Sequence, residues 1–229
     1  MNAPLHDRSH LQLVRTADGS NTLRDPSMDE PYHSLHGALQ ESWHVFIVNG
    51  LRAVDKADVD VLEVGLGTGL NMLLTWLQVV EGKCRVRYTA LEPHPLPRPL
   101  LQAVDHCAQC GVPTLTDAWL DAMTAAPGAL TEGLGGFRFT WRQAGVEALT
   151  DTEAYDVVYF DAFAPSKQPG LWTADVFARL FRALRPGGVL VTYSAKGEVR
   201  RTLEAVGFRV EKLTGPPGKR EMLRGRKPN

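Results

Sequence analysis

The feature that most constrains the fold of this chain is an apolar segment followed at once by a glycine-rich turn. Residues 59–64 have the length and composition of a buried strand. Gly65, Gly67 and Gly69 follow it, and the apolar stretch NMLLTWLQVV then predicts a helix. Glycines at this point permit a tight turn and leave room for a ligand against the helix N-terminus. A purely structural turn uses the same residues, so the turn alone leaves both interpretations open.

The rest of the chain continues the alternation of strands and helices. Further strands are predicted near residues 86–91, 137–141, 155–160 and 189–193, with helices near 100–110, 117–125, 173–184 and 197–206. Such alternation indicates a mostly parallel sheet with helices on both faces. Residues 208–213 and 221–223 flank the turn GPPG and predict an antiparallel hairpin at one edge. We therefore expect a Rossmann-like α/β fold with a mostly parallel, seven-stranded sheet.

The polar N-terminal region predicts an extension to this domain. Residues 1–30 suggest an extended arm, and Ser34 is a candidate cap for a helix over 37–49. Leu39, Trp43, Phe46 and Ile47 are spaced to form its apolar face. We expect residues 1–50 to pack on the cofactor site as an N-terminal extension and residues 51–229 to form the main domain.

Composition excludes several classes of protein. The 229 residues contain no apolar run of membrane-span length, and the N-terminus lacks the apolar core of a signal peptide, which predicts a cytoplasmic protein without a membrane partner. Cys107 and Cys110 form a single C-x-x-C without a second ligand pair, so no metal site is predicted. The segment from Lys196 to the end holds ten Lys or Arg against four Glu, which suits a polyanion or an ordinary solvated surface.

An acidic residue at the end of the second strand favours a ligand at the glycine turn. Glu92 stands where a carboxylate can accept hydrogen bonds from a ribose diol, as it does for both NAD and S-adenosylmethionine (SAM). A dinucleotide turn usually reads G-x-G-x-x-G, whereas here the glycines occupy every second position and Glu63 precedes them. The pattern E-x-G-x-G-x-G resembles motif I of class I SAM methyltransferases, so SAM is the predicted cofactor.

This resemblance implies a set of cofactor contacts. The turn would hold the methionine part, Glu92 the ribose, and the residues after the third strand the adenine. Methyltransferases often have an acidic residue at that last position, where this chain has Gln143. The candidates are Glu63, Gly65, Gly67, Thr68, Gly69, Asn71, Glu92, Pro93, Gln143 and Ala144, with Asp161 at the reacting end.

The fourth strand ends at Asp161, beside the expected position of the methyl group. Taken alone, such a residue is either a loop cap or a reacting group. Methyl transfer to a primary amine needs a neutral nitrogen, and a carboxylate can orient the ammonium and accept its proton. Phe163 and Pro165 are expected to wall the pocket, with Lys167, Gln168 and Trp172 on the following loop. Aromatic groups there favour a cationic ligand.

Several longer segments resemble one family, the tRNA wobble-uridine methyltransferases called MnmD, which also form the methyltransferase half of bifunctional MnmC. They are YHSLHGALQES (32–42), VLEVGLGTGLN (61–71), DAFAPSKQPGLWT (161–173), YSAKGEVRRTL (193–203) and GPPGKREML (215–223). The resemblance covers nearly all of the chain from about residue 30 onward. It is carried most specifically by DAFAP and GKREML.

The resemblance implies methylation of the exocyclic amine of 5-aminomethyl-(2-thio)uridine at the tRNA wobble position. It also implies that Asp161 is the acidic residue near the amine and that Tyr32, Ser34 and Glu41 lie near the cofactor. The implied contacts to substrate or to the anticodon loop are Phe163, Lys167, Trp172, Lys196, Arg200, Arg201, Lys219 and Arg220. For each basic residue, a surface salt bridge is the alternative interpretation.

Three other functions remain open from the sequence. They are methylation of another amine, of a small molecule or a protein; a tRNA-binding role without catalysis; and aminopropyl transfer, which would need further acidic residues. The FAD-dependent oxidase domain of MnmC has no counterpart before Asn229, so we expect methyl transfer only. We also expect a monomer.

Overall fold

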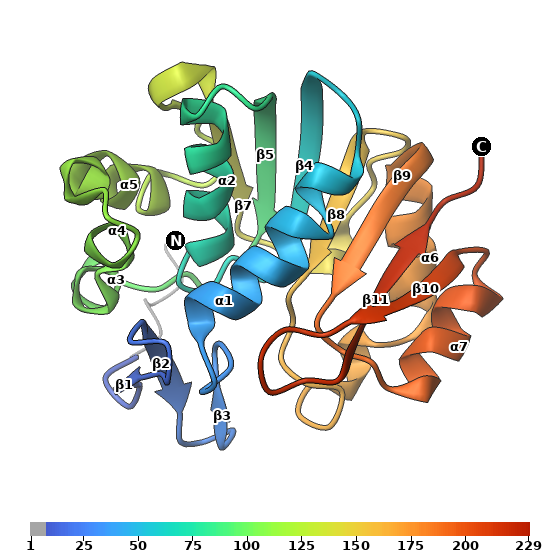
Figure 1. Ribbon diagram of the computed structural model, residues 1–229, viewed down its shortest axis with the longest axis horizontal. Helices are drawn as coiled ribbons and strands as arrows, with labels where there is room; N and C mark the ends of the chain where they lie inside the picture. Colours follow the sequence, from blue (N-terminus) through green and yellow to red (C-terminus); the bar gives the residue numbers. More distant parts are fainter. Residues whose placement is uncertain (1–7) are drawn as a thin grey trace.

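The computed structural model describes residues 8–229, whose centre is an eight-stranded sheet (Figure 1). The strand order is β10-β11-β9-β8-β4-β5-β7-β6. The parallel strands are β4 (Asp58–Val64), β5 (Arg85–Leu91), β7 (Arg138–Arg142), β8 (Tyr155–Phe160) and β9 (Leu184–Thr192). The antiparallel strands are β6 (Thr131–Glu132), β10 (Arg209–Thr214) and β11 (Glu221–Arg226). The predicted α/β class with a C-terminal hairpin is confirmed, and the two-residue β6 is an edge strand beyond the seven predicted.

Helices cover both faces of this sheet, because the side chains of successive residues in its central strands point to opposite faces. In β4, Val59 and Val61 belong to the core beneath α2 (Leu70–Val80), while Leu62 and Val64 belong to the core beneath α6 (Ala174–Ala183) and α7 (Gly197–Ala205). Three short helices lie beyond α2: α3 (Arg98–Val104), α4 (His106–Gln109) and α5 (Thr116–Met123). Single 3-10 turns are η2 (Leu51–Ala53), η3 (Pro113–Leu115), η4 (Leu134–Gly136), η5 (Val146–Ala148) and η6 (Pro169–Leu171).

The N-terminal region is folded, so the predicted extended arm is wrong over the described residues. β1 (Gln12–Arg15), β2 (Asn21–Asp25) and β3 (Glu30–Pro31) form a separate antiparallel sheet. Side chains close its two turns: Asp18 accepts a hydrogen bond from the Ser20 N–H, and Asp25 accepts one from the Ser27 N–H. Local side-chain bonds of this kind hold a turn without a large core. Residues 1–7 of the expected arm lie outside the described residues.

The first helix begins later than its expected cap. α1 (Ala38–Ser42) has Gly37 at its N-cap and continues as the π-helix η1 (Trp43–Val48), so Ser34 does not cap it. The Ser34 N–H instead donates to Glu41 Oε1 at 3.2 Å. Phe46 and Ile47 are buried as predicted, whereas 36% of Trp43 is exposed.

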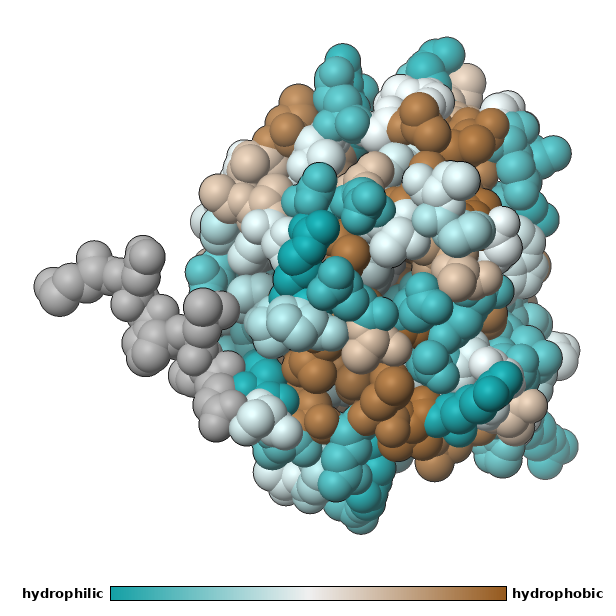
Figure 2. Space-filling model, turned by 90° about the vertical axis from the view of Figure 1, so that its left-hand side faces the viewer, coloured by the Kyte–Doolittle hydropathy of each residue, from teal (hydrophilic) through white to brown (hydrophobic). Residues whose placement is uncertain are grey.

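The side of the molecule that carries α3, α4 and α5 has a mixed surface. Figure 2 shows apolar residues gathered in the lower part of this side, bordered by hydrophilic ones. No helix among residues 8–229 is long and apolar enough to cross a bilayer.

Candidate active site

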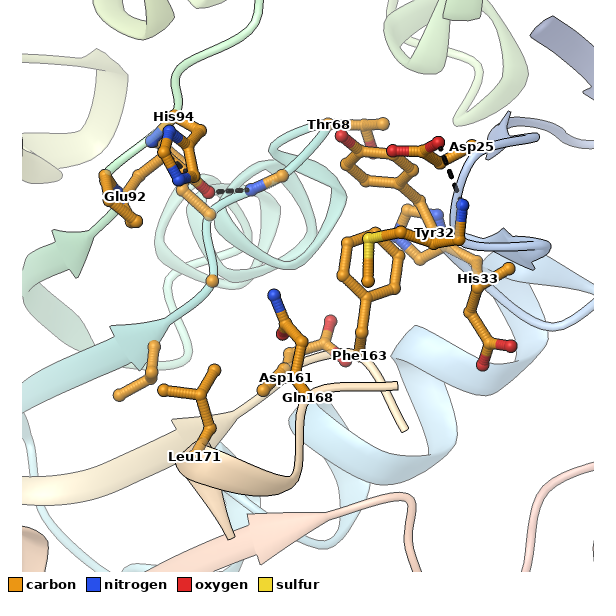
Figure 3. Close-up of a pocket in the computed structure, with 18 of the residues that line it drawn as sticks. Asp25, Tyr32, His33, Thr68, Glu92, His94, Asp161, Phe163, Gln168 and Leu171 are labelled. Carbon is orange, nitrogen blue, oxygen red and sulfur yellow. Dashed lines mark hydrogen bonds between the residues drawn. The ribbon is translucent and has the colours of Figure 1, made fainter. Parts of the chain in front are cut away.

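A cavity of about 590 Å³ opens at the carboxyl ends of β4, β5 and β8. Parallel α/β sheets bind ligands at this edge, and the volume lies in the range of small-molecule sites. Its walls come from the N-terminal sheet, the glycine turn, the ends of β5 and β7, and the loop after β8. Figure 3 shows residues of these segments around one space, with Asp161 and Phe163 between Tyr32 and Leu171.

The glycine turn has a backbone that larger residues would not tolerate. Gly65 has a φ of 90°, and a Cβ there would lie 2.5 Å from the carbonyl oxygen of Asp161. Gly67 has a φ of 51°, and its Cβ would lie 3.2 Å from the Tyr32 ring. Gly69 faces Met123 and Trp119 instead, so it serves helix packing and does not line the cavity. Two of the three glycines therefore keep the ligand side of the turn open.

Glu92 is held in a fixed orientation beside the glycine turn. Its Oε2 accepts a hydrogen bond from the Gly67 N–H at 3.0 Å, and its Oε1 accepts one from the His94 N–H at 2.8 Å. The side chain is nearly buried, and Pro93 and Thr68 line the cavity beside it. Each carboxylate oxygen keeps a further lone pair with which it can accept a hydroxyl hydrogen bond. This geometry suits a ribose diol.

The cavity wall after β7 does not include the two residues expected to contact adenine. Gln143 and Ala144 are not among the lining residues; the wall after β7 is formed by Gly145, Val146 and Glu147. The Ala144 N–H bonds back to the Arg142 carbonyl, which makes a tight turn directly after the strand. The chain therefore reaches the cavity two residues later than the motif suggested.

Beneath the cavity, one amide joins two carboxyl groups. Asn71 Nδ2 donates to Glu63 Oε1 at 2.9 Å and to Asp161 Oδ2 at 2.8 Å. Glu63 is fully buried, and burial holds its pKa well above the usual range. Neither Glu63 nor Asn71 lines the cavity. Both residues lie behind Asp161. Asn71 orients the Asp161 carboxylate, and Glu63 holds Asn71.

Asp161 lines the cavity in an environment that favours its protonated form. Burial, with the nearby Glu41 carboxylate, raises the pKa of Asp161 to about 7, against the smaller lowering effects of Asn71 and Lys219. A carboxyl group with this pKa exchanges a proton readily at neutral pH. It can therefore orient an ammonium group and also accept its proton.

Aromatic side chains enclose the space in front of Asp161. The rings of Tyr32 and Phe163 meet edge to face with centroids 5.1 Å apart. Tyr193 also lines the cavity, and its hydroxyl donates to the Ala162 carbonyl at 2.9 Å. Such rings stabilise a cationic ligand through their quadrupoles.

The residues expected to contact tRNA divide into three groups. Trp172 is buried against Phe160 and donates its Nε1–H to the Phe163 carbonyl, so it supports the cavity wall from the core. Lys219 lines the cavity itself and pairs with Glu41. Phe163 lines the cavity as well. The five other basic residues lie at the surface; Arg200 pairs with Glu204, whereas no ion pair to described residues is found for Lys167, Lys196, Arg201 and Arg220.

Several lining residues carried no recognised signal. Asp25, Met28 and His33 reach the cavity from the N-terminal sheet, which the sequence did not predict. Leu171 and Tyr193 follow β8 and β9. Tyr193 could have been found from the rule that ligands lie beyond strand ends, because it directly follows β9.

Comparisons with known proteins agree with this geometry. Residues 142–228 match a family described as S-adenosyl-L-methionine-dependent methyltransferase. The "tRNA 5-methylaminomethyl-2-thiouridine biosynthesis bifunctional protein MnmC" of Burkholderia multivorans is 35% identical over 219 residues, which are 89% of this chain and 33% of that protein. The protein of the same name from Ralstonia nicotianae is 36% identical over 205 residues, 85% of this chain and 31% of its own length.

The chain is a homologue of the MnmC proteins. It spans about a third of the length of these relatives. The structure of MnmC2 from Aquifex aeolicus superposes with a TM-score of 0.75 at 25% identity, covering 98% of this chain and 74% of that one. A probable spermidine synthase from Corynebacterium glutamicum, with a TM-score of 0.54 at 18% identity over 94% of this chain and 76% of that one, shares the fold alone. The MnmC relatives confirm the predicted family resemblance, and the family match over residues 142–228 supports the predicted cofactor, SAM.

Proposed function

We propose that this chain transfers a methyl group from SAM to the amine of 5-aminomethyl-(2-thio)uridine at the wobble position of tRNA, giving the 5-methylaminomethyl form. The observation that carries the proposal is the placement of Asp161, with a pKa raised to about 7, between the glycine turn and the Tyr32–Phe163 wall. The names of the MnmC relatives support the choice of a modified 2-thiouridine in tRNA.

The residues of the cavity fit SAM. Gly65 and Gly67 bring backbone without side chains to the cavity wall, and Glu92 offers a fixed carboxylate beside them. Asp25 and Tyr32 close the cavity from the N-terminal sheet. When bound, SAM supplies an electrophilic methyl group. The protein's contribution is to bind it, exclude water and present the amine.

The amine reaches the site as an ammonium ion at neutral pH. Asp161 orients this ion through a charge-assisted hydrogen bond and accepts one of its protons, which leaves a nitrogen lone pair free to attack. Asn71 keeps the Asp161 carboxylate in place through its 2.8 Å hydrogen bond. Once the nitrogen has been methylated it is cationic again, and the aromatic wall stabilises it.

Exposed basic residues around this site are the candidates for tRNA phosphates. Lys167 lies on the loop after β8, and Lys196 is the N-cap of α7. Arg201 lies in the middle of α7, and Arg220 lies in the turn before β11. We propose that they bind the anticodon stem and loop. We also propose that residues 1–50 serve as the extension that closes the cofactor site of a methyltransferase domain over 51–229, and that the protein acts as a cytoplasmic monomer.

Methyl transfer from labelled SAM to tRNA from cells that lack this activity, followed by nucleoside mass spectrometry, tests the proposal. The expected product is 5-aminomethyl-(2-thio)uridine with one added methyl group. Absence of transfer by protein that binds SAM in the same preparation would contradict the tRNA substrate and direct the search to other amines.

A further inference from the structure

The turn between β10 and β11 is fixed onto the N-terminal part of the chain. Lys219 Nζ donates to Glu41 Oε2 at 2.5 Å, joining residues 178 positions apart. A Cβ at Gly218 would overlap the ring of His36, so the two segments touch there. At the base of the turn, His44 Nε2 is hydrogen-bonded to the Thr214 carbonyl at 2.7 Å. Lys219 is thus part of an internal contact and not a free surface cation.

This contact lies at the cavity. Glu41, Lys219 and Asp161 are three of the charged residues that line it. Glu41 is buried, and its other oxygen accepts the Ser34 N–H. The Lys219 ammonium also lies 3.9 Å from the centroid of the Tyr193 ring, which restricts it further. The pair is therefore held at a defined place beside the proposed reacting group.

We propose that Lys219 is a positioning residue: it neutralises Glu41, so that, of the two carboxylates Glu41 and Asp161, only Asp161 presents a net negative charge to the substrate amine. The catalytic role of Lys219 in this inference rests on the proposed function. The arrangement of Glu41, Lys219 and Asp161 does not depend on that function.

The other groups that face Asp161 do not replace the effect of the Glu41 and Lys219 charges on its ionisation. Burial raises the pKa of Glu63 of β4 well above its usual range, and Asn71 of α2 carries no charge. Tyr88 of β5 and Tyr193 after β9 are phenols whose pKa burial raises. Glu41 and Lys219 are therefore the two charges that, together with burial, set how easily Asp161 ionises. Two unpaired carboxylates in one half-closed cavity would disfavour ionisation of Asp161, as like charges do.

A titration of the free protein tests this without any substrate. The Asp161 carboxyl carbon is followed by ¹³C NMR and assigned through its loss in Asp161→Asn. We expect its midpoint to rise by roughly one pH unit in Lys219→Met and to fall by roughly one in Glu41→Gln. Lys219→Arg should match the wild type, and the double variant should lie between the two single variants. Loss of a merely structural contact would not move the two midpoints in opposite directions.

Lys212→Met is the matched control. Lys212 pairs with Glu221 at 3.0 Å in the same hairpin, but both side chains are exposed and neither lines the cavity. Its Asp161 titration should equal that of the wild type. If Lys219→Met does not fold, Glu41→Gln and Lys219→Arg still decide the question: an unchanged midpoint in Glu41→Gln would overturn the proposal.

Kinetics give the second readout. The acidic limb of kcat for tRNA methylation should move with the NMR midpoint in each variant, while KM for tRNA stays within about twofold. A raised KM and a shallower salt dependence in Lys219→Met, with an unmoved Asp161 titration, would make Lys219 a phosphate contact and overturn the inference. If the wild type methylates no tRNA, the proposed function fails, and the NMR titration still decides the pairing of the three groups.

Discussion

Replacing Asp161 by Asn should separate catalysis from stability at one position. The amide has the shape of the carboxyl group, and its oxygen can still accept the hydrogen bond from Asn71. It cannot accept a proton from an ammonium group at neutral pH. We expect turnover to fall by about 10²–10⁴-fold, the usual contribution of a general base.

The stability of Asp161→Asn should rise although its turnover falls, because the pKa of Asp161 is raised on folding from 3.8 to about 7. A carboxyl group with a raised pKa in the folded state favours folding while it is protonated. Its contribution is lost as the pH rises from about 4 to about 7. At 1.36 kcal/mol per pH unit, the shift corresponds to about 4 kcal/mol as an upper bound. Because the cavity is open to water, about 2 kcal/mol is the expected gain in Asp161→Asn above pH 8.

Urea denaturation at pH 4.5 and at pH 8.5 measures this effect. The variant and the wild type should differ little at the lower pH, and the variant should be the more stable protein at the higher pH. SAM binding should stay within about threefold of the wild type, since Asp161 is assigned to the amine. Equal stabilities at pH 8.5 would refute the raised pKa, and wild-type turnover would remove Asp161 from the mechanism.

Three further changes test the cofactor and tRNA surfaces. Gly65→Ala should lower the free energy of unfolding, measured by urea denaturation, by about 1–3 kcal/mol and abolish measurable SAM binding. The reason is that residue 65 has a φ of 90° and that its Cβ would meet the Asp161 carbonyl. A stable variant with normal SAM binding would contradict this prediction. Glu92→Gln should weaken SAM binding by about tenfold in calorimetry, because an amide cannot accept both backbone N–H bonds; unchanged affinity would exclude the ribose contact. Neutralising Lys196, Arg201 and Arg220 together should reduce the slope of log K for tRNA against log[salt] by about 2, with an unchanged slope leaving them outside the interface.

The sequence by itself determined the alternating strands and helices of the main sheet and the main points of the site. Glycines every second residue after a buried strand, an acidic residue after the next strand, and Asp161 after the fourth all lie at the carboxyl edge of one parallel sheet. This worked because the direction of parallel strands places every strand end of one kind at the same edge. The surface position of Lys196, Arg201 and Arg220 also agrees with their charge.

Only the tertiary structure decided which of these residues reach the ligand. Glu63 and Gly69 belong to the motif, yet one is buried behind Asp161 and the other packs on Met123. Trp172 belongs to the family-like segment 161–173, yet its side chain lies in the core.

Lys219 shows the limit most clearly. The basic residues of the C-terminal segment around it, such as Arg220, suggested a basic surface, but its partner Glu41 is 178 residues away. Burial and pairing depend on how distant segments pack, and local pattern carries no information about that packing. The chemical types at the site therefore follow from the sequence, while the ionisation and pairing of each group follow from the fold.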